Sequence, residues 1–112
     1  MSGGQDTSKD TSKTSGTTET LADLRREIDA IDEKLVHLLA SRLEVVQRVV
    51  KVKNRDGLPA NIPERVEEVV ASACRRAEIE GLPPELAELI WRDMVAWIID
   101  YENQHLTTDK RG

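Results

Sequence analysis

One apolar periodicity runs through residues 21–52 and constrains the fold of this chain more than any other feature. Apolar residues recur at alternating intervals of three and four, at Leu21, Leu24, Ile28, Ile31, Leu35, Leu38, Val45, Val49 and Val52. That spacing places them on one stripe of an α-helix, like the seam of helices that pack lengthwise. The pattern predicts a single helix from about residue 21 to about residue 54.

The length of this helix predicts that it needs a partner chain. At 1.5 Å per residue it would be ~50 Å long, and a chain of 112 residues cannot cover such a helix alone. Thr18 or Thr20 is a suitable N-cap, and Asp56-Gly57 is a stop signal.

A shorter helix is expected after a loop at residues 58–62. It starts near Pro63, with Asn61 and Glu64 spaced as a capping-box-like pair, and Gly81 ends it. Its apolar face comprises Val66, Val69, Val70, Ala73 and Ala77.

A third helix, of medium length, is expected from Pro83-Pro84 to about Leu106. Its apolar positions cover much of its circumference, so the helix is predicted to be largely buried; they are Leu86, Leu89, Ile90, Met94, Val95, Trp97, Ile98 and Tyr101. The predicted fold class is therefore all-α, a three-helix chain in the order long, short, medium.

Composition limits the function classes. Residues 1–19 and 108–112 are predicted to be disordered tails around one domain at 20–107, since the first segment is almost devoid of apolar residues. A net charge of −5 argues against binding to nucleic acid or a membrane surface. A single cysteine, no apolar leader and no long apolar run together favour a cytoplasmic protein. His37, His105 and Cys74 lack metal-ligand spacing, so no metal site is expected.

Arg42 interrupts the apolar stripe of the long helix. It is either a snorkelling or structurally paired cation, or an arginine that binds an anion. Lys53 lies 11 residues later, which puts it on the same face and ~16 Å away along the axis. The two cations can bracket a small anion over a floor that includes Val49, although a charged residue near a helix end is normally solvated.

Three further charged residues are candidates on weaker grounds. Arg25 lies ~25 Å from Arg42 along the helix, so it joins that site only from a second, antiparallel chain; otherwise it is a surface residue with Asp29 at i+4. Glu102 ends an apolar stripe of the third helix, where desolvation favours a protonated carboxyl that can donate a hydrogen bond; otherwise it is exposed. Arg65 occupies a first helical turn, where the helix dipole disfavours a cation, or it is simply solvated.

These residues carry a resemblance to a known family. LADLRREIDAIDEKLVHLLASR (21–42), KVK (51–53) and IPERV (62–66) resemble the all-helical chorismate mutases and their isochorismate pyruvate lyase relatives. The resemblance covers residues 21–106. It implies an intertwined helical homodimer with two identical sites that use no cofactor.

The resemblance also implies roles for individual residues. Arg25 matches the arginine that reaches into the neighbouring chain's site, and Arg42 matches the one that grips a substrate carboxylate. Lys53 matches the lysine on a carboxylate and the ether oxygen, and Arg65 matches the arginine that follows the loop. Glu102 matches a position that is glutamine in most bacterial members and glutamate in fungal ones.

The sequence departs from the bacterial mutase pattern near the substrate. Val66 stands where bacterial mutases usually carry a glutamate for the substrate hydroxyl, and Ile98 replaces a polar residue one turn before Glu102. An aspartate expected near Ile62 is also missing. The P-E-R-V sequence looks more like the lyase branch, and aminodeoxychorismate mutases also look apolar at Val66.

The resemblance implies a small dicarboxylate substrate and a pericyclic reaction. Rearrangement of chorismate to prephenate needs a compact conformer and charge stabilisation at the breaking ether oxygen, with no nucleophile. Arg25 and Arg42 would fix the carboxylates, while Lys53 and a protonated Glu102 would donate to the ether oxygen. Isochorismate pyruvate lyase, aminodeoxychorismate mutase and a non-catalytic helical interaction module remain the alternatives.

Overall fold

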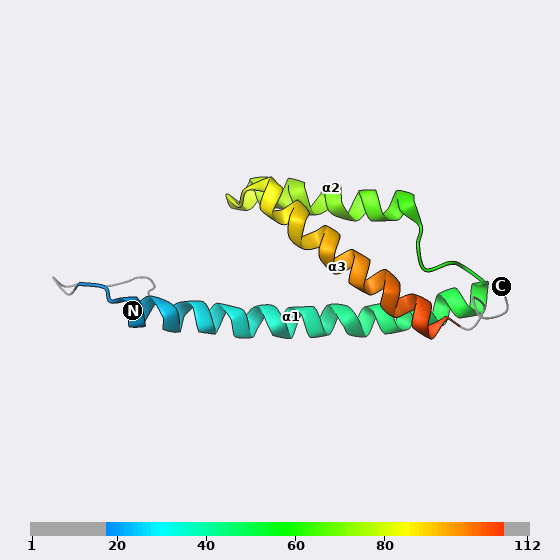
Figure 1. The fold of residues 1–112 in the computed structure, drawn as a ribbon, viewed down its shortest axis with the longest axis horizontal. Helices are drawn as coiled ribbons and strands as arrows, with labels where there is room; N and C mark the ends of the chain where they lie inside the picture. The colour runs from blue at the N-terminus through cyan, green and yellow to red at the C-terminus, as the bar shows by residue number, and fades with distance from the viewer. Residues whose placement is uncertain (1–17, 107–112) are drawn as a thin grey trace. The chain divides into compact units, whose positions relative to one another are not determined.

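The computed structural model describes residues 18–106, and within that range the chain forms helices and no strand (Figure 1). The helices are α1 (Leu21–Asp56), α2 (Pro63–Glu80) and α3 (Pro84–His105). The predicted all-α class and the order long, short, medium are confirmed. The tails predicted to be disordered lie almost entirely outside the described residues.

The chain divides into two units, Met1–Ala40 and Ser41–Gly112, and α1 extends across their boundary. In the first unit, Thr20 caps α1, because the Asp23 N–H donates to Thr20 Oγ1 at 3.1 Å and the Thr20 N–H donates to Asp23 Oδ2 at 3.4 Å. These reciprocal bonds form a capping box. Hydrogen bonds from Thr20 lower the pKa of the Asp23 carboxyl, and the nearby Arg26 cation adds to the effect.

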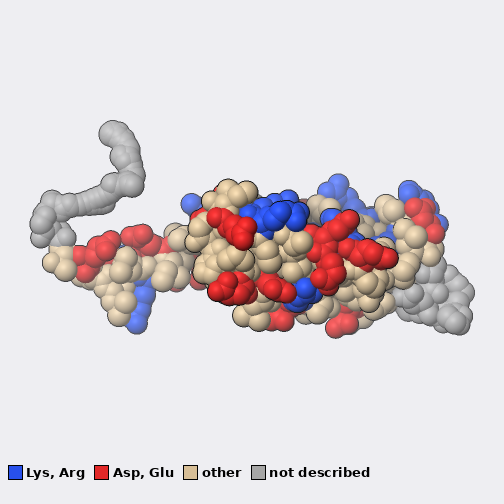
Figure 2. Space-filling view, turned by 90° about the horizontal axis from the view of Figure 1, so that it is seen from above, with Lys and Arg blue, Asp and Glu red and all other residues tan. Residues whose placement is uncertain are grey.

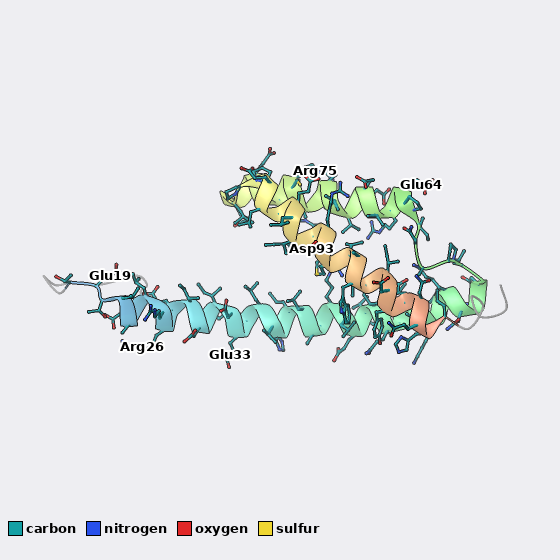
Figure 3. The ribbon with its side chains drawn as sticks, in the orientation of Figure 1. Glu19, Arg26, Glu33, Glu64, Arg75 and Asp93 are labelled. Atoms are coloured by element: carbon teal, nitrogen blue, oxygen red, sulfur yellow. The ribbon has the colours of Figure 1, made fainter. Side chains whose placement is uncertain are left out.

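The apolar stripe in this first unit is exposed. Its members, Leu21, Leu24, Ile28, Ile31, Leu35 and Leu38, are all exposed. The side chains of Arg26 and Glu33 project from the same stretch of helix (Figure 3). In the described residues of this unit, the whole apolar stripe is therefore open to solvent.

In the second unit, the same helix becomes part of a core. Val46 and Val50 are buried, and the helix ends at Asp56, two residues later than predicted. Gly57 follows with φ of 69°, a left-handed conformation that glycine adopts without a steric penalty. The Leu58 N–H donates to the Lys53 carbonyl at 2.9 Å, which closes the last turn.

The start of α2 corrects one prediction. Asn61 and Glu64 do not form a capping box, since the N-cap residue is Ile62 and no side chain caps the helix. Pro63 occupies the first turn, where a missing N–H costs nothing and the fixed φ suits the helix. At the other end, Gly81 has φ of 79°, and the Leu82 N–H donates to the Ala77 carbonyl at 2.8 Å, as the predicted stop requires.

α2 and α3 pack against each other. Small buried residues on both helices, Val70, Ala73, Ala77, Ala87 and Val95, allow close approach. At the surface, the Arg92 guanidinium of α3 donates to both carboxylate oxygens of Glu67 on α2, at 3.1 and 3.0 Å, and also to Glu88 at 2.9 Å. The Arg92 cation lowers the pKa of the Glu67 carboxyl through these hydrogen bonds.

The prediction that α3 is largely buried is wrong for the single chain. Leu86, Leu89, Ile90 and Trp97 are exposed, and Trp97 retains 58% of its accessible surface. Only Ala87, Val95 and Glu102 of α3 are buried. The two buried apolar positions of α3 are small residues, and its larger apolar residues stay half-buried or exposed in the described part of the chain.

A second core lies where the last turn of α3 meets the end of α1 (Figure 1). Val50, Ala60 and Leu106 form this cluster, and Ile99 and Tyr101 pack against it. The Asn54 side-chain amide donates to the His105 carbonyl at 3.1 Å. The C-terminal end of α3, the loop after α1 and the end of α1 are thereby held together.

Candidate active site

Lys53 and Glu102 form the most buried ion pair in the described part of the chain. Lys53 comes from the last turns of α1 and Glu102 from the last turns of α3, 49 residues away in sequence. The Lys53 ammonium donates to Glu102 Oε1 at 2.7 Å, and Glu102 keeps 5% of its accessible surface. The two residues singled out separately in the sequence therefore meet in the fold.

The Lys53 ammonium has a second acceptor in the loop after α1. It donates to the Ala60 backbone carbonyl at 2.9 Å. An ammonium group carries three N–H donors, and these two acceptors account for two of them. The third N–H has no acceptor among residues 18–106, so it can donate to an oxygen atom of a ligand.

Burial of the Lys53–Glu102 ion pair costs free energy, and its hydrogen bonds offset part of that cost. Removing two charges from water carries a large desolvation penalty, which close contact and additional hydrogen bonds offset. In this chain Glu102 accepts a hydrogen bond from a cation, whereas the sequence argument made it a donor. A protonated carboxyl group can do both, because its carbonyl oxygen accepts while its hydroxyl donates.

Arg42 lies on the same helix as Lys53 and is half-buried. Within residues 18–106, no carboxylate forms an ion pair with it, so the structural alternative of an intrachain pair finds no partner there. A half-buried arginine without a counterion is well suited to an anionic ligand.

The remaining predicted residues are placed less closely. Arg65 is exposed, with its side chain 69% accessible, and it donates to Glu68 at 3.2 Å, so the single chain does not bring it to Lys53. Val66 and Ile98 are half-buried, and Val49 is exposed. That these three apolar residues line the substrate site stays a prediction.

Arg25 belongs to the first unit and is exposed. The pairing with Asp29 that would make it an ordinary surface residue is not formed in the part of α1 that the structure describes. Its contribution to a site stays a prediction.

Two features of the second unit were missed by sequence reasoning. The Ala60 carbonyl is a backbone group in a loop, and nothing in the residue type marks it. Arg92 reads as an ordinary exposed residue, although its i−4 spacing from Glu88 is a signal that could have revealed half of its network.

The described residues contain no cluster of three His, Cys, Asp or Glu side chains that could hold a metal ion. On the face shown in Figure 2, Lys and Arg side chains lie among Asp and Glu side chains. None of the helices at residues 18–106 has the length and apolarity needed to cross a membrane.

A comparison with family models shows to which protein family the chain belongs. The model for chorismate mutase type II matches residues 24–103, which include both members of the ion pair as well as Arg25 and Arg42. The chain belongs to the chorismate mutase type II family. The resemblance noted in the sequence is thereby confirmed.

Similar proteins lie on more than one branch of this family. The chain is 43% identical to the T-protein of Enterobacter agglomerans over 83 residues, 74% of this chain and 22% of that protein. It is 45% identical to the chorismate mutase of Methanocaldococcus jannaschii over 47 residues, 42% of this chain and 48% of that protein. It is 34% identical to the isochorismate pyruvate lyase of Pseudomonas aeruginosa over 80 residues, 70% of this chain and 77% of that protein. The chain thus spans about a fifth of the T-protein and about half of the archaeal enzyme.

Proposed function

We propose that this member of the chorismate mutase type II family converts chorismate to prephenate. The observation that carries the proposal is the Lys53 ammonium, which is held by two acceptors and keeps one N–H for a ligand oxygen. A donor aimed in advance stabilises developing charge without reorganisation during the reaction. That is what a Claisen rearrangement requires at its breaking ether oxygen.

The mechanism needs no covalent intermediate. Arg42 binds one carboxylate of the substrate and holds the compact conformer in which the two reacting carbons approach. Lys53 donates to the ether oxygen as the C–O bond breaks and the new C–C bond forms. Glu102 orients Lys53, and in its protonated form it adds a second donor to the same oxygen.

The second carboxylate is bound by Arg25 of a partner chain in this proposal. The exposed stripe of α1, together with the exposed apolar residues of α3, supports a homodimer that covers both. An antiparallel partner would bring Arg25 to the far end of the other chain's α1, which the same chain cannot do over ~25 Å.

One observation favours a second candidate substrate. Val66 has no polar group for the C4 hydroxyl of chorismate, and the isochorismate pyruvate lyase relative aligns over most of its own length. The lyase reaction is also pericyclic and could use the same donors. Elimination of pyruvate from isochorismate is therefore the alternative activity, followed by aminodeoxychorismate rearrangement.

The test is a parallel assay of the purified chain with chorismate, isochorismate and aminodeoxychorismate. We expect the largest kcat/KM with chorismate and formation of prephenate. A larger kcat/KM with either analogue would reassign the substrate, and no turnover of any of the three would contradict the proposal.

A complementation experiment tests the shared site. Arg42→Ala should lower kcat/KM by at least ~10²-fold with an unchanged helical spectrum, and Arg25→Ala should also be impaired. An equal mixture of refolded Arg25→Ala and Arg42→Ala chains should recover about a quarter of the wild-type rate, because half of the dimers are mixed and each holds one intact site. No recovery on mixing would place both arginines in the same chain's site. Arg48→Ala, at an exposed position of the same helix, is the matched control.

A further inference from the structure

Leu106 directly follows α3 and has the most complete burial of any large side chain at residues 18–106. It has 0% of its accessible surface left and lies in extended backbone, with φ −90° and ψ 118°. It packs in one cluster with Val50 of α1 and Ala60 of the loop. Leu106 lies beyond residue 103, where the family match ends, so family membership assigns it no role.

Ala60 connects this cluster to the ion pair. It is buried, whereas its neighbours Pro59 and Asn61 are exposed, so the Ala60 methyl group anchors the loop between α1 and α2. The carbonyl of the same residue accepts the hydrogen bond from Lys53. The packing of Ala60 against Leu106 therefore determines where that carbonyl points.

Leu106 also fixes the second acceptor of Lys53. Glu102 lies one helical turn before Leu106, so anchoring the end of α3 fixes the carboxylate. The bond from the Asn54 side chain to the His105 carbonyl strengthens the same junction. Both acceptors that orient the Lys53 ammonium thus depend on one buried leucine.

We propose that Leu106 is a positioning residue, which aims the remaining N–H of Lys53 by holding Ala60 and Glu102 in place. This inference rests on the proposed function, since the aimed N–H matters only if it donates to a reacting oxygen. A misplacement of ~1 Å in a preorganised site can cost up to ~10²-fold in rate without abolishing substrate binding. The expected signature is a loss in kcat that exceeds the change in KM.

The kinetic test compares Leu106→Ala with Leu106→Met. We expect Leu106→Ala to lower kcat for chorismate by at least about 10-fold and to change KM by less than about 3-fold. Leu106→Met preserves volume and should stay within about 3-fold of wild-type kcat. Ile79→Ala is the control, because it truncates an apolar residue that is 81% exposed at the end of α2 and should leave the rate unchanged.

A second readout follows Lys53 without any substrate. The free proteins are acetylated with limiting acetic anhydride at fixed pH, and modification of Lys53 and of the exposed Lys51 is quantified by peptide mass spectrometry. Lys53 is shielded by its two acceptors, so its modification relative to Lys51 should be low in the wild type and in Leu106→Met. The ratio should rise several-fold in Leu106→Ala.

The two readouts separate failure of this inference from failure of the proposed function. If the wild type does not turn over chorismate, the proposed function falls, and the acetylation ratio still decides whether Leu106 positions Lys53. If Leu106→Ala loses its helical spectrum, Leu106→Val, which removes one methylene, takes its place in both experiments. A folded variant with wild-type kcat and a wild-type acetylation ratio overturns the inference, as does a rise in KM that accounts for the whole loss.

Discussion

The two halves of α1 share one periodicity and have different surroundings. In residues 21–40, every apolar member of the stripe is exposed. In residues 41–56, the same helix buries Val46 and Val50 and contributes Lys53 to a buried ion pair. The stripe itself is exposed in both halves, because Val45, Val49 and Val52 are exposed as well, and only the second half also has a buried face, formed by the neighbouring Val46 and Val50.

This difference shows what an apolar stripe does and does not determine. The stripe determines that a helix forms and which of its faces needs covering. It does not determine whether the cover comes from the same chain. The six seam residues are 38–62% exposed, so burying the rest of each contributes about half of the roughly 1.5–3 kcal/mol of a whole side chain, which is about 5–10 kcal/mol of gross hydrophobic stabilisation for the six.

The largest effect is expected from charged substitutions in the exposed apolar stripe of α1, within residues 21–40. Ile31→Lys combined with Leu35→Lys places two charges in the seam, which a packed interface cannot solvate. Sedimentation of the wild type should give about twice 12.6 kDa, and the double variant should sediment as a single chain. Activity should fall by at least ~10³-fold, because each site then lacks its partner's Arg25.

Glu33→Lys is the control for this experiment. It changes the net charge by the same +2, on the same stretch of helix, at a charged and exposed position outside the stripe. It should remain dimeric and active. A wild type that is monomeric and fully active would remove the need for a partner altogether.

The next largest effect is expected from a substitution of Lys53, in the second half of α1. Lys53→Ala should lower kcat/KM by ~10²–10³-fold, since it removes a donor to the ether oxygen. It should also lower the free energy of unfolding by ~3–5 kcal/mol, because Glu102 is left buried without its cation. Urea denaturation and steady-state kinetics measure the two losses separately.

A double variant separates stability from catalysis at this pair. Lys53→Ala with Glu102→Leu removes both charges, and it should recover much of the stability while staying inactive. Lys51→Ala, two residues away and exposed, should leave both measurements near wild type. Full activity in Lys53→Ala would remove this lysine from the mechanism.

Sequence reasoning located what depends on local chemistry. The period of α1, the Thr20 cap and the left-handed glycines at 57 and 81 were all predictable, because each depends on residues within a turn or two of itself. The expected cap by Asn61 failed for a reason of the same scale: Pro63 begins α2 and Ile62 takes the N-cap position.

The site was predictable only in part. Lys53 and Glu102 were each identified as candidates from their own helices. A helical period cannot predict that two residues 49 positions apart in sequence are in contact. Before the structure, only the resemblance to a known family placed them in the same site. The Ala60 carbonyl was out of reach, since the direction of a loop carbonyl depends on tertiary packing. The exposure of α3 was predicted wrongly because burial was inferred from how much of the helix circumference is apolar. That pattern does not distinguish residues buried in the core of one chain from residues buried at an interface between chains.

A smaller effect is expected from Glu102→Gln, and it concerns pH. If Glu102 donates to the ether oxygen, it must carry a proton, so kcat/KM should decline as pH rises from about 4.5 to 9. Glutamine keeps a donor and still accepts from Lys53, so Glu102→Gln should flatten that decline. A flat wild-type profile, or two profiles that superimpose, would leave Glu102 only the role of an acceptor that orients Lys53.

The smallest effect should come from the exposed ion pair that joins α2 and α3, and it contrasts with the buried one. Arg92 lowers the pKa of Glu67 in the folded chain, so this pair stabilises the fold above the unfolded glutamate's pKa of about 4.5 and loses that contribution as pH falls through the lowered value. Glu67→Gln should therefore lower Tm slightly at pH 7 in low salt, and the difference from wild type should vanish near pH 3 and shrink in 1 M salt. Thermal denaturation by circular dichroism measures it, with Glu64→Gln as an exposed control on the same helix. If Glu67→Gln lowered Tm as much as Lys53→Ala does, the exposed Glu67–Arg92 pair would contribute as much to stability as the buried Lys53–Glu102 pair. The expected difference between the two ion pairs would then be wrong.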